Sequence, residues 1–198
     1  MDWVAVAAVA AGAAVLAPSV AGARYPSIHP AEARVFHAVN GLPGWLYPVL
    51  WLPMQLGNLF IGLAVGLVIA WLEGDWGMAL AVAAAAAAKL LAERVVRNRM
   101  ADFLTVRQRP GTSEQGAILR GADVPESGDS FPSGHVILAT SIATVVAPEL
   151  PLPTVWVPLV IAAVVGVARV YVGAHNPLDV SAGFGAGLIV GGLALFLR

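Results

Sequence analysis

Six apolar stretches constrain the fold of this chain more than any other feature of its sequence. A helix needs roughly 20 apolar residues to cross a bilayer, and each of the six stretches comes close to that length. Only 12% of the residues are charged, whereas a soluble domain usually has about 25%. We therefore predict an all-α, polytopic bundle of six transmembrane helices plus a short interfacial helix, forming one domain over residues 1–198 in a cell membrane. The stretches cover residues 3–20, 46–72, 76–91, 132–148, 155–172 and 178–197.

The first apolar stretch allows two interpretations. Its Ala-rich sequence ends near Ala21-Gly22-Ala23, which suits the cleavage site of a signal peptide. Met1-Asp2 offers no positively charged start, however. A helix that stays in the protein is therefore the favoured interpretation.

Residues 24–44 mix charged with apolar side chains. Apolar residues at positions 35, 36, 39 and 42 recur at helical spacing, which predicts a short amphipathic helix at the membrane interface. In the following apolar stretch, Pro48 and Pro53 are expected to break the first part of the helix from the rest. In the last stretch, Gly183, Gly187 and Gly191 fall four residues apart, which favours close contact with another helix.

An even number of crossings places both termini on one side of the membrane. The segment 24–44, the polar segment 97–131 and the turn 174–177 then all lie on the other side. A connection as long as 97–131 is uncommon unless it is functional or disordered. We expect its part 111–130 to shape the access of a headgroup.

Arg169 lies within an otherwise apolar stretch. An arginine in mid-span costs about 2.5–3.5 kcal/mol on insertion scales, so it is normally paired or functional, although near the end of a span it can reach the interface. His175 and Asp179 follow it. Asn176 and Pro177 suit the start of a helix. Asp179 is then either a helix-capping acid or a carboxylate that orients His175.

A second group of residues, Pro132-Ser133-Gly134-His135, opens the fourth apolar stretch. Proline sets the first helical turn, and Ser133 and Gly134 leave the backbone N–H groups accessible. Such a helix N-terminus suits an oxyanion or a phosphate. Taken alone, His135 would more often be a polar residue at the membrane interface.

The third group is the basic sequence Arg107-Gln108-Arg109-Pro110, which alone would fit a membrane-anchoring cluster. Together the three groups supply two histidines, one acid and several guanidinium groups on one membrane face. Arginines bind phosphate oxygens bidentately, and one histidine can attack phosphorus while the other protonates the leaving oxygen. The chain has no cysteine, and no carboxylate cluster is available for a metal. The sequence thus predicts phosphoryl transfer without a metal or cofactor, and the net charge of −1 gives no sign of a nucleic-acid partner.

These three groups resemble the three-part signature of the type 2 phosphatidic acid phosphatase family, which shares its core with vanadium haloperoxidases and bacterial acid phosphatases. The resemblance covers the whole chain. It implies that His175 is the nucleophile that forms a phosphohistidine, that Asp179 orients it, and that His135 is the general acid. It also implies a set of groups that hold the phosphate: Arg109, Ser133, the Gly134 amide and Arg169.

One position departs from the family pattern. The family places a lysine seven residues before the arginine of Arg109-Pro110, and this chain has Asp102 there. Lys89, the only lysine, lies too far back in the third apolar stretch to replace it. Arg107 or Arg99 is the expected substitute in phosphate binding, although an arginine does not reproduce a lysine's chemistry.

The resemblance implies a membrane lipid phosphatase that hydrolyses a phosphate monoester or pyrophosphate on a polyprenyl lipid or a glycerolipid. Two alternatives remain open. One is a phosphotransferase that passes the group from the same phosphohistidine to an alcohol. The other is a weakly active lipid-binding module, which Asp102 favours. The partner is a lipid phosphate within the bilayer, and a homo-oligomer is also compatible with the sequence. Candidate substrates are polyprenyl pyrophosphate, polyprenyl phosphoribose phosphate, phosphatidylglycerophosphate and phosphatidic acid.

The distribution of arginine bears on which side of the membrane carries the site. Apart from Arg109 and Arg169, the motif side holds most of the arginines and the opposite side only Arg198. The positive-inside rule then favours the cytoplasm, whereas many bacterial members of the family act on the outer face. We favour the cytoplasmic face. The arginines counted on the motif side are Arg24, Arg34, Arg94, Arg97, Arg99, Arg107 and Arg120.

Overall fold

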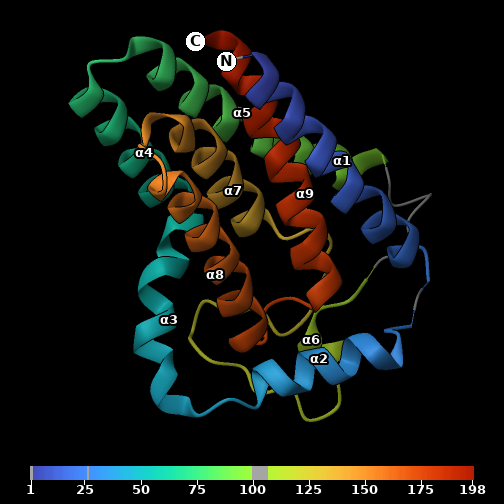
Figure 1. Ribbon diagram of the computed structural model, residues 1–198. Coiled ribbons are helices and arrows are strands. Elements are labelled where there is room, and N and C mark those ends of the chain that lie inside the picture. The colour runs from blue at the N-terminus through green and yellow to red at the C-terminus, as the bar shows by residue number, and fades with distance from the viewer. Residues whose placement is uncertain (1, 26, 100–106) are drawn as a thin grey trace.

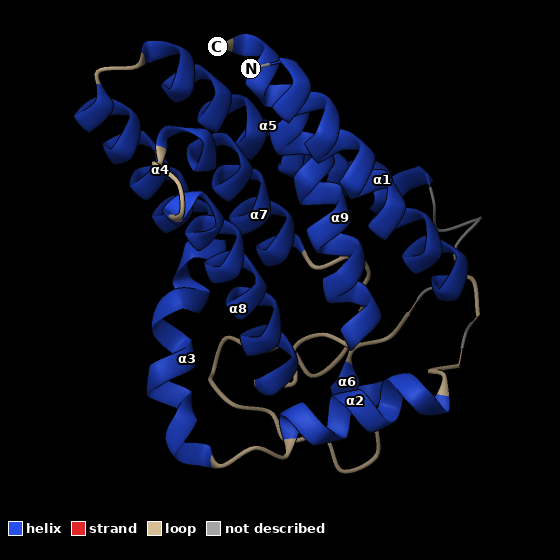
Figure 2. Cartoon of the chain, viewed as in Figure 1, coloured by secondary structure: helices blue, strands red, loops and turns tan. Residues whose placement is uncertain are grey.

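The computed structural model describes residues 2–25, 27–99 and 107–198, and within these ranges it contains helices but no β-strand (Figure 2). The prediction of an all-α fold is confirmed. The α-helices are α1 (Asp2–Ala23), α2 (Pro30–Asn40), α3 (Tyr47–Met54), α4 (Leu59–Glu73), α5 (Trp76–Arg99), α6 (Pro110–Ser113), α7 (Gly134–Val146), α8 (Val157–Tyr171) and α9 (Pro177–Ala194). Short 3-10 helices join or extend them: η1 (Gly44–Leu46), η2 (Gln55–Gly57), η3 (Ala147–Glu149), η4 (Thr154–Trp156) and η5 (Leu195–Leu197).

The centre of the bundle is α7, whose residues 136–146 are all buried. It contacts α4, α5, α8 and α9, and α9 in turn packs against α1 (Figure 1). The glycine face predicted for the last helix is confirmed. Gly187 lies against Thr140 of α7, and Gly191 lies against Ser141 and Thr144, so the absence of side chains lets the two backbones approach closely.

Three helical segments in the described part of the chain are long and apolar enough to cross a bilayer: Trp3–Ala23, Thr154–Tyr171 and Pro177–Leu197. The pair Gly44–Gly57 and Leu59–Glu73 is bent by 72° and adds a fourth if it forms one span. The break comes just after Pro53, as predicted, whereas Pro48, which was also expected to break the helix, lies in the first turn of α3. The Asn58 side chain caps α4.

The predicted number of six spans is therefore not confirmed. The helix α7 has only 13 residues, which at about 1.5 Å per residue is shorter than the roughly 30 Å hydrocarbon core. The helix α5 is long, but its second half carries Lys89, Glu93 and Arg94.

The short amphipathic helix expected in residues 24–44 is present as α2, which lies across the ends of α8 and α9 (Figure 1). The N- and C-terminal ends lie together at the opposite end of the bundle. There Arg198 forms ion pairs with Asp75, at the turn between α4 and α5, and with Glu149 of η3.

The described part of the polar segment, residues 107–131, is anchored to the helices around it. The Asn40 side chain donates to the carbonyls of Ile118 and Tyr171, both at 2.9 Å, and accepts from the Ile118 N–H at 2.8 Å. Arg120 donates to the Tyr171 carbonyl at 2.7 Å, and its guanidinium lies 4.3 Å from the centre of the Tyr171 ring. These contacts fix the segment against α2 and the end of α8.

Candidate active site

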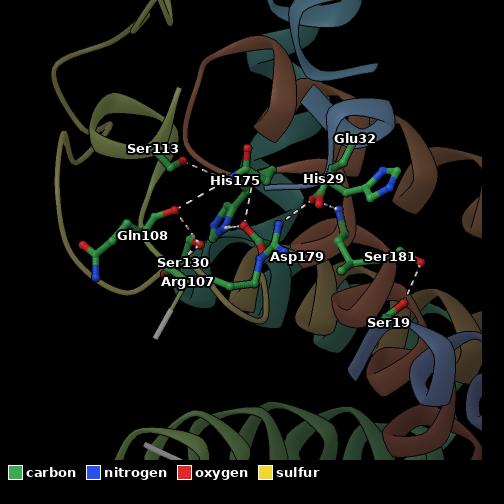
Figure 3. A network of polar contacts seen from close by, with 12 residues as sticks. Ser19, His29, Glu32, Arg107, Gln108, Ser113, Ser130, His175, Asp179 and Ser181 are labelled. Carbon is green, nitrogen blue, oxygen red and sulfur yellow. Dashed lines mark hydrogen bonds and ion pairs between the residues drawn. The ribbon is translucent and has the colours of Figure 1, made fainter. Parts of the chain in front are cut away.

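Three segments that are distant in the sequence meet at the start of α9. The Ser133 N–H donates to the Asp179 carbonyl at 3.0 Å, and Arg109 Nη1 donates to the Ala174 carbonyl at 2.9 Å. The Asn176 side chain donates to the Gln108 carbonyl at 3.4 Å (Figure 3). The structure thus brings together all three groups of residues that the sequence analysis singled out.

Asp179 is the fully buried acid at the centre of this junction. Its Oδ2 accepts from the Asn176 N–H at 2.9 Å, as expected for the third residue of a helix capped by asparagine. The same Oδ2 lies 3.9 Å from His175 Nδ1, which is longer than a hydrogen bond. Asp179 therefore caps the helix and also places its charge beside the imidazole.

Arg107 lies on the other side of Asp179, where it links two carboxylates. Its Nε donates to Asp179 Oδ1 at 3.0 Å, and its Nη2 donates to Glu32 Oε1 at 2.5 Å (Figure 3). The sequence analysis placed Arg107 among the phosphate ligands. Because its guanidinium is buried and taken up by these carboxylates, we revise its expected role to that of positioning Asp179.

Glu32 of α2 is a member of the site that the sequence analysis missed. Its Oε1 also accepts from the Leu178 N–H at 2.9 Å, so it joins α2 to the first turn of α9. Burial raises the pKa of Glu32, while the Leu178 N–H and Arg107 oppose that shift. The sequence did contain a signal, since Glu32, Phe36 and Asn40 follow one another at four-residue spacing on the buried side of α2.

His175 stands in the turn between α8 and α9 and is almost completely buried. Burial lowers the pKa of its imidazole; Asp179 opposes that shift, and the charges of Arg169 and Arg109 add to it. The neutral imidazole is therefore favoured, and a neutral ring nitrogen is the form that can act as a nucleophile. Since Nδ1 faces Asp179, Nε2 is the nitrogen on the opposite edge of the ring.

Arg169, near the end of α8, carries a buried guanidinium without a carboxylate partner among the described residues. Its Nη1 donates to the sulfur of Met54 at 3.6 Å, and its Nε has no hydrogen-bond partner within the described ranges. Ser133 Oγ is also buried and unpaired within the described part of the chain. Buried polar groups are normally satisfied, so these atoms indicate a place suited to a polar ligand, and Arg169 gives it a positive charge.

The start of α7 forms the rest of this candidate site for a polar ligand. Ser133 is the N-cap of α7, and its side chain makes no capping hydrogen bond, so the first N–H groups of the helix remain open to an anion. His135 packs against Gly57, where a Cβ would lie 2.7 Å from the histidine Cβ. The imidazole of His135 is close enough to Arg169, His175 and Arg109 to interact with each of them electrostatically.

The remaining predicted cations differ in their placement. Arg109 is the N-cap of α6 and is half-buried; burial lowers the pKa of its guanidinium, while Asp179 and Asp129 oppose that shift. Arg99 ends α5, and its side chain, like the whole of Asp102, lies outside the described residues. Lys89, which the sequence analysis judged too distant, has its Cε 3.2 Å from where a Cβ of Gly134 would lie. The lysine comes this close because α5 packs alongside α7.

Among the described residues, no group of three or more His, Cys, Asp or Glu side chains could hold a metal ion. The independence from metals remains a prediction.

Comparisons with known proteins show the family to which the chain belongs. Residues 76–197 match the PAP2 superfamily. The chain is 33% identical over 141 residues to decaprenylphosphoryl-5-phosphoribose phosphatase of Mycobacterium tuberculosis, and the match covers 70% of each chain. It is also 33% identical over 124 residues to the bacitracin transport permease protein BcrC of Bacillus licheniformis, covering 61% of this chain and 57% of that protein.

Two solved structures are similar in fold. LpxE of Aquifex aeolicus superposes with a TM-score of 0.63 at 24% identity, covering 82% of this chain and 93% of that one. The PAP2-type phosphatidylglycerolphosphate phosphatase of Bacillus subtilis superposes with a TM-score of 0.67 at 22% identity, covering 93% and 94%.

Proposed function

Because the chain belongs to the PAP2 superfamily, we propose that it is a membrane enzyme that hydrolyses a phosphate monoester or pyrophosphate carried by a lipid. One observation supports this proposal above the others. Arg169 Nε and Ser133 Oγ are both buried and unpaired among the described residues, close to the junction of the three motifs. A phosphoryl group supplies the acceptor oxygens that the arginine and serine lack.

In the proposed reaction, His175 Nε2 attacks phosphorus and forms an N–P bond while the P–O bond to the lipid breaks. His135 donates a proton to the leaving oxygen. A water molecule then attacks the phosphohistidine, His135 takes up its proton, and the N–P bond breaks to release inorganic phosphate. Asp179 stabilises the positive charge that the His175 ring acquires when it attacks.

The phosphate in this proposal is bound by groups that are already in place. Arg169 and Arg109 neutralise the charge that builds up on the equatorial oxygens, and Ser133 Oγ and the Gly134 N–H donate to them. Such preorganised donors stabilise the transition state without reorganisation during the reaction. No metal is assigned a role in this proposal.

We place the substrate among polyprenyl lipids with a phosphorylated sugar or a pyrophosphate group. The support is the match to a protein named decaprenylphosphoryl-5-phosphoribose phosphatase over 70% of this chain.

We also propose that the chain crosses the membrane six times, because α7 is enclosed by other helices and need not match the bilayer thickness itself. The active site then faces the cytoplasm, as the arginine distribution favours.

The test is phosphate release by the purified protein across a panel of polyprenyl and glycerolipid phosphates, for the wild type and His175→Ala. We expect near-complete loss of turnover in His175→Ala. His29→Asn is a matched control, because His29 caps α2 outside the site and asparagine is an equally good cap. An active His175→Ala variant would refute the proposal, and phosphate appearing on an added alcohol would identify a phosphotransferase instead.

A further inference from the structure

Two charged side chains of α5 lie at the start of α7, and the reaction described above does not use them. Lys89 Nζ and Glu93 Oε2 form an ion pair at 3.0 Å, and the lysine side chain is only 12% exposed. A Cβ built on Gly134 would collide with Glu93 Oε1 and would lie 3.2 Å from Lys89 Cε. Lys89 is also close enough to His135 to interact with it electrostatically.

Stabilisation of α5 does not explain this pair. In a helix, a glutamate four residues before a lysine stabilises more than the reverse order, and here the lysine comes first. The lysine follows an uncharged run, residues 76–88, and its side chain is largely buried, which makes an unpaired charge costly there. The stability of α5 therefore does not account for the position of the Lys89 and Glu93 side chains beside Gly134.

The carboxylate of Glu93 lies where an anion is favoured. The first N–H groups of α7 have no side-chain cap, and a helix N-terminus attracts negative charge. Next to them, Ser133 Oγ is buried and unpaired among the described residues. A substrate phosphate bound at this N-terminus would compete with Glu93 for the same space and for the same cation.

We propose that Glu93 is a resident anion that the substrate phosphate displaces, and that Lys89 then transfers its ion pair from Glu93 to the phosphate. The inference rests on the proposed phosphatase function and adds two residues to its binding site. Glu93 keeps Lys89 paired in the absence of substrate. It thereby weakens phosphate binding and also favours release of the inorganic phosphate product.

The test compares Glu93→Gln and Lys89→Met with the wild type, measuring kcat, KM and the inhibition constant for inorganic phosphate. We expect Glu93→Gln to bind inorganic phosphate about tenfold more tightly and to have a lower KM. We expect Lys89→Met to bind inorganic phosphate about tenfold more weakly, or weaker still, and to have a KM raised by a similar factor. In the double variant, the affinity for phosphate should be higher than in Lys89→Met alone, because the unneutralised carboxylate has been removed. Arg94→Met, an exposed cation on the same helix, should leave these constants unchanged.

Thermal unfolding of each variant identifies a loss of fold. Lys89→Arg keeps the positive charge, so we expect it to retain the phosphate affinity that Lys89→Met loses. If Glu93→Gln and Lys89→Met fold but leave KM and phosphate inhibition unchanged while His175→Ala is inactive, this inference is wrong and the phosphatase proposal stands. If the wild type shows no turnover, the phosphatase proposal fails, and calorimetry with inorganic phosphate still decides whether Lys89 and Glu93 control anion binding.

Discussion

At the scale of single residues, the candidate site is built from helix N-termini. Ser133 and Arg109 stand at the N-cap positions of α7 and α6, and Asp179 is the third residue of α9. The start of α9 was predicted from Asn176 and Pro177, which are local features. Arg109 was instead singled out by its basic neighbours and by the family resemblance. Pro132 was expected in the first turn of α7 but lies before that helix, which begins at Gly134. Glu32, Lys89 and Glu93 reach the site through packing of α2 and α5 against other helices. The spacing of residues along the chain contains little information on such contacts.

Arg107 provides a test of the revised assignment. Arg107→Met leaves Asp179 and Glu32 without the cation between them, and breaking a buried ion pair in this way costs about 3–5 kcal/mol. We expect a lower melting temperature and a lower kcat with little change in KM, because Asp179 is no longer held beside His175. Thermal unfolding and steady-state kinetics measure both effects.

Arg34→Met serves as the control, since Arg34 is an exposed arginine of α2 and its loss should change neither quantity. A folded Arg107→Met protein with a raised KM and unchanged kcat would show that Arg107 binds the phosphate after all.

At the scale of helices, the prediction from sequence succeeded where the pattern is periodic. The helix α2 and the glycine face of α9 follow from residue spacing, and the break in the second stretch follows from its prolines; all three are present. The number of membrane crossings was not predictable to the same degree. Whether a short helix such as α7 crosses depends on what encloses it, and enclosure is a property of the packed bundle.

The glycine contact between α7 and α9 predicts a difference between two otherwise equal substitutions. A Cβ at Gly187 would lie 2.5 Å from Thr140 Cβ, whereas a Cβ at Gly44 meets nothing within 4 Å. We expect Gly187→Ala to destabilise the protein by about 1–3 kcal/mol, as overpacking does, and Gly44→Ala to be close to neutral. Equal melting temperatures of the two variants in detergent would argue against close packing at this contact.

At the scale of the whole molecule, the chain separates its charges between two ends. The motif end gathers the three groups of site residues, α2 and the described part of the polar segment, while the other end has the pairing of Arg198 with Asp75 and Glu149. The even number of crossings inferred from sequence predicted this separation. The order within residues 107–131 was harder to foresee, because it depends on long-range contacts such as those of Asn40 with Ile118 and Tyr171.

The cytoplasmic placement of the motif end can be tested by labelling single cysteines, since the chain has none of its own. Gln115→Cys and Glu73→Cys place a thiol at exposed positions near opposite ends of the molecule. In intact cells, we expect a membrane-impermeant reagent to label position 73 and not position 115. Labelling of position 115 alone would put the active site on the outer face.

The 72° bend between Gly44–Gly57 and Leu59–Glu73 lies next to two candidate site residues. Met54 and Gly57, the residues at the bend, touch Arg169 and His135 respectively. Many side chains of α4 are exposed along its length, among them Phe60 and Trp71. If the proposed function holds, we expect a change in bilayer thickness at this elbow to shift these two residues, to which the proposal assigns phosphate binding and proton transfer. We therefore expect turnover to depend on the thickness of the bilayer that surrounds the protein.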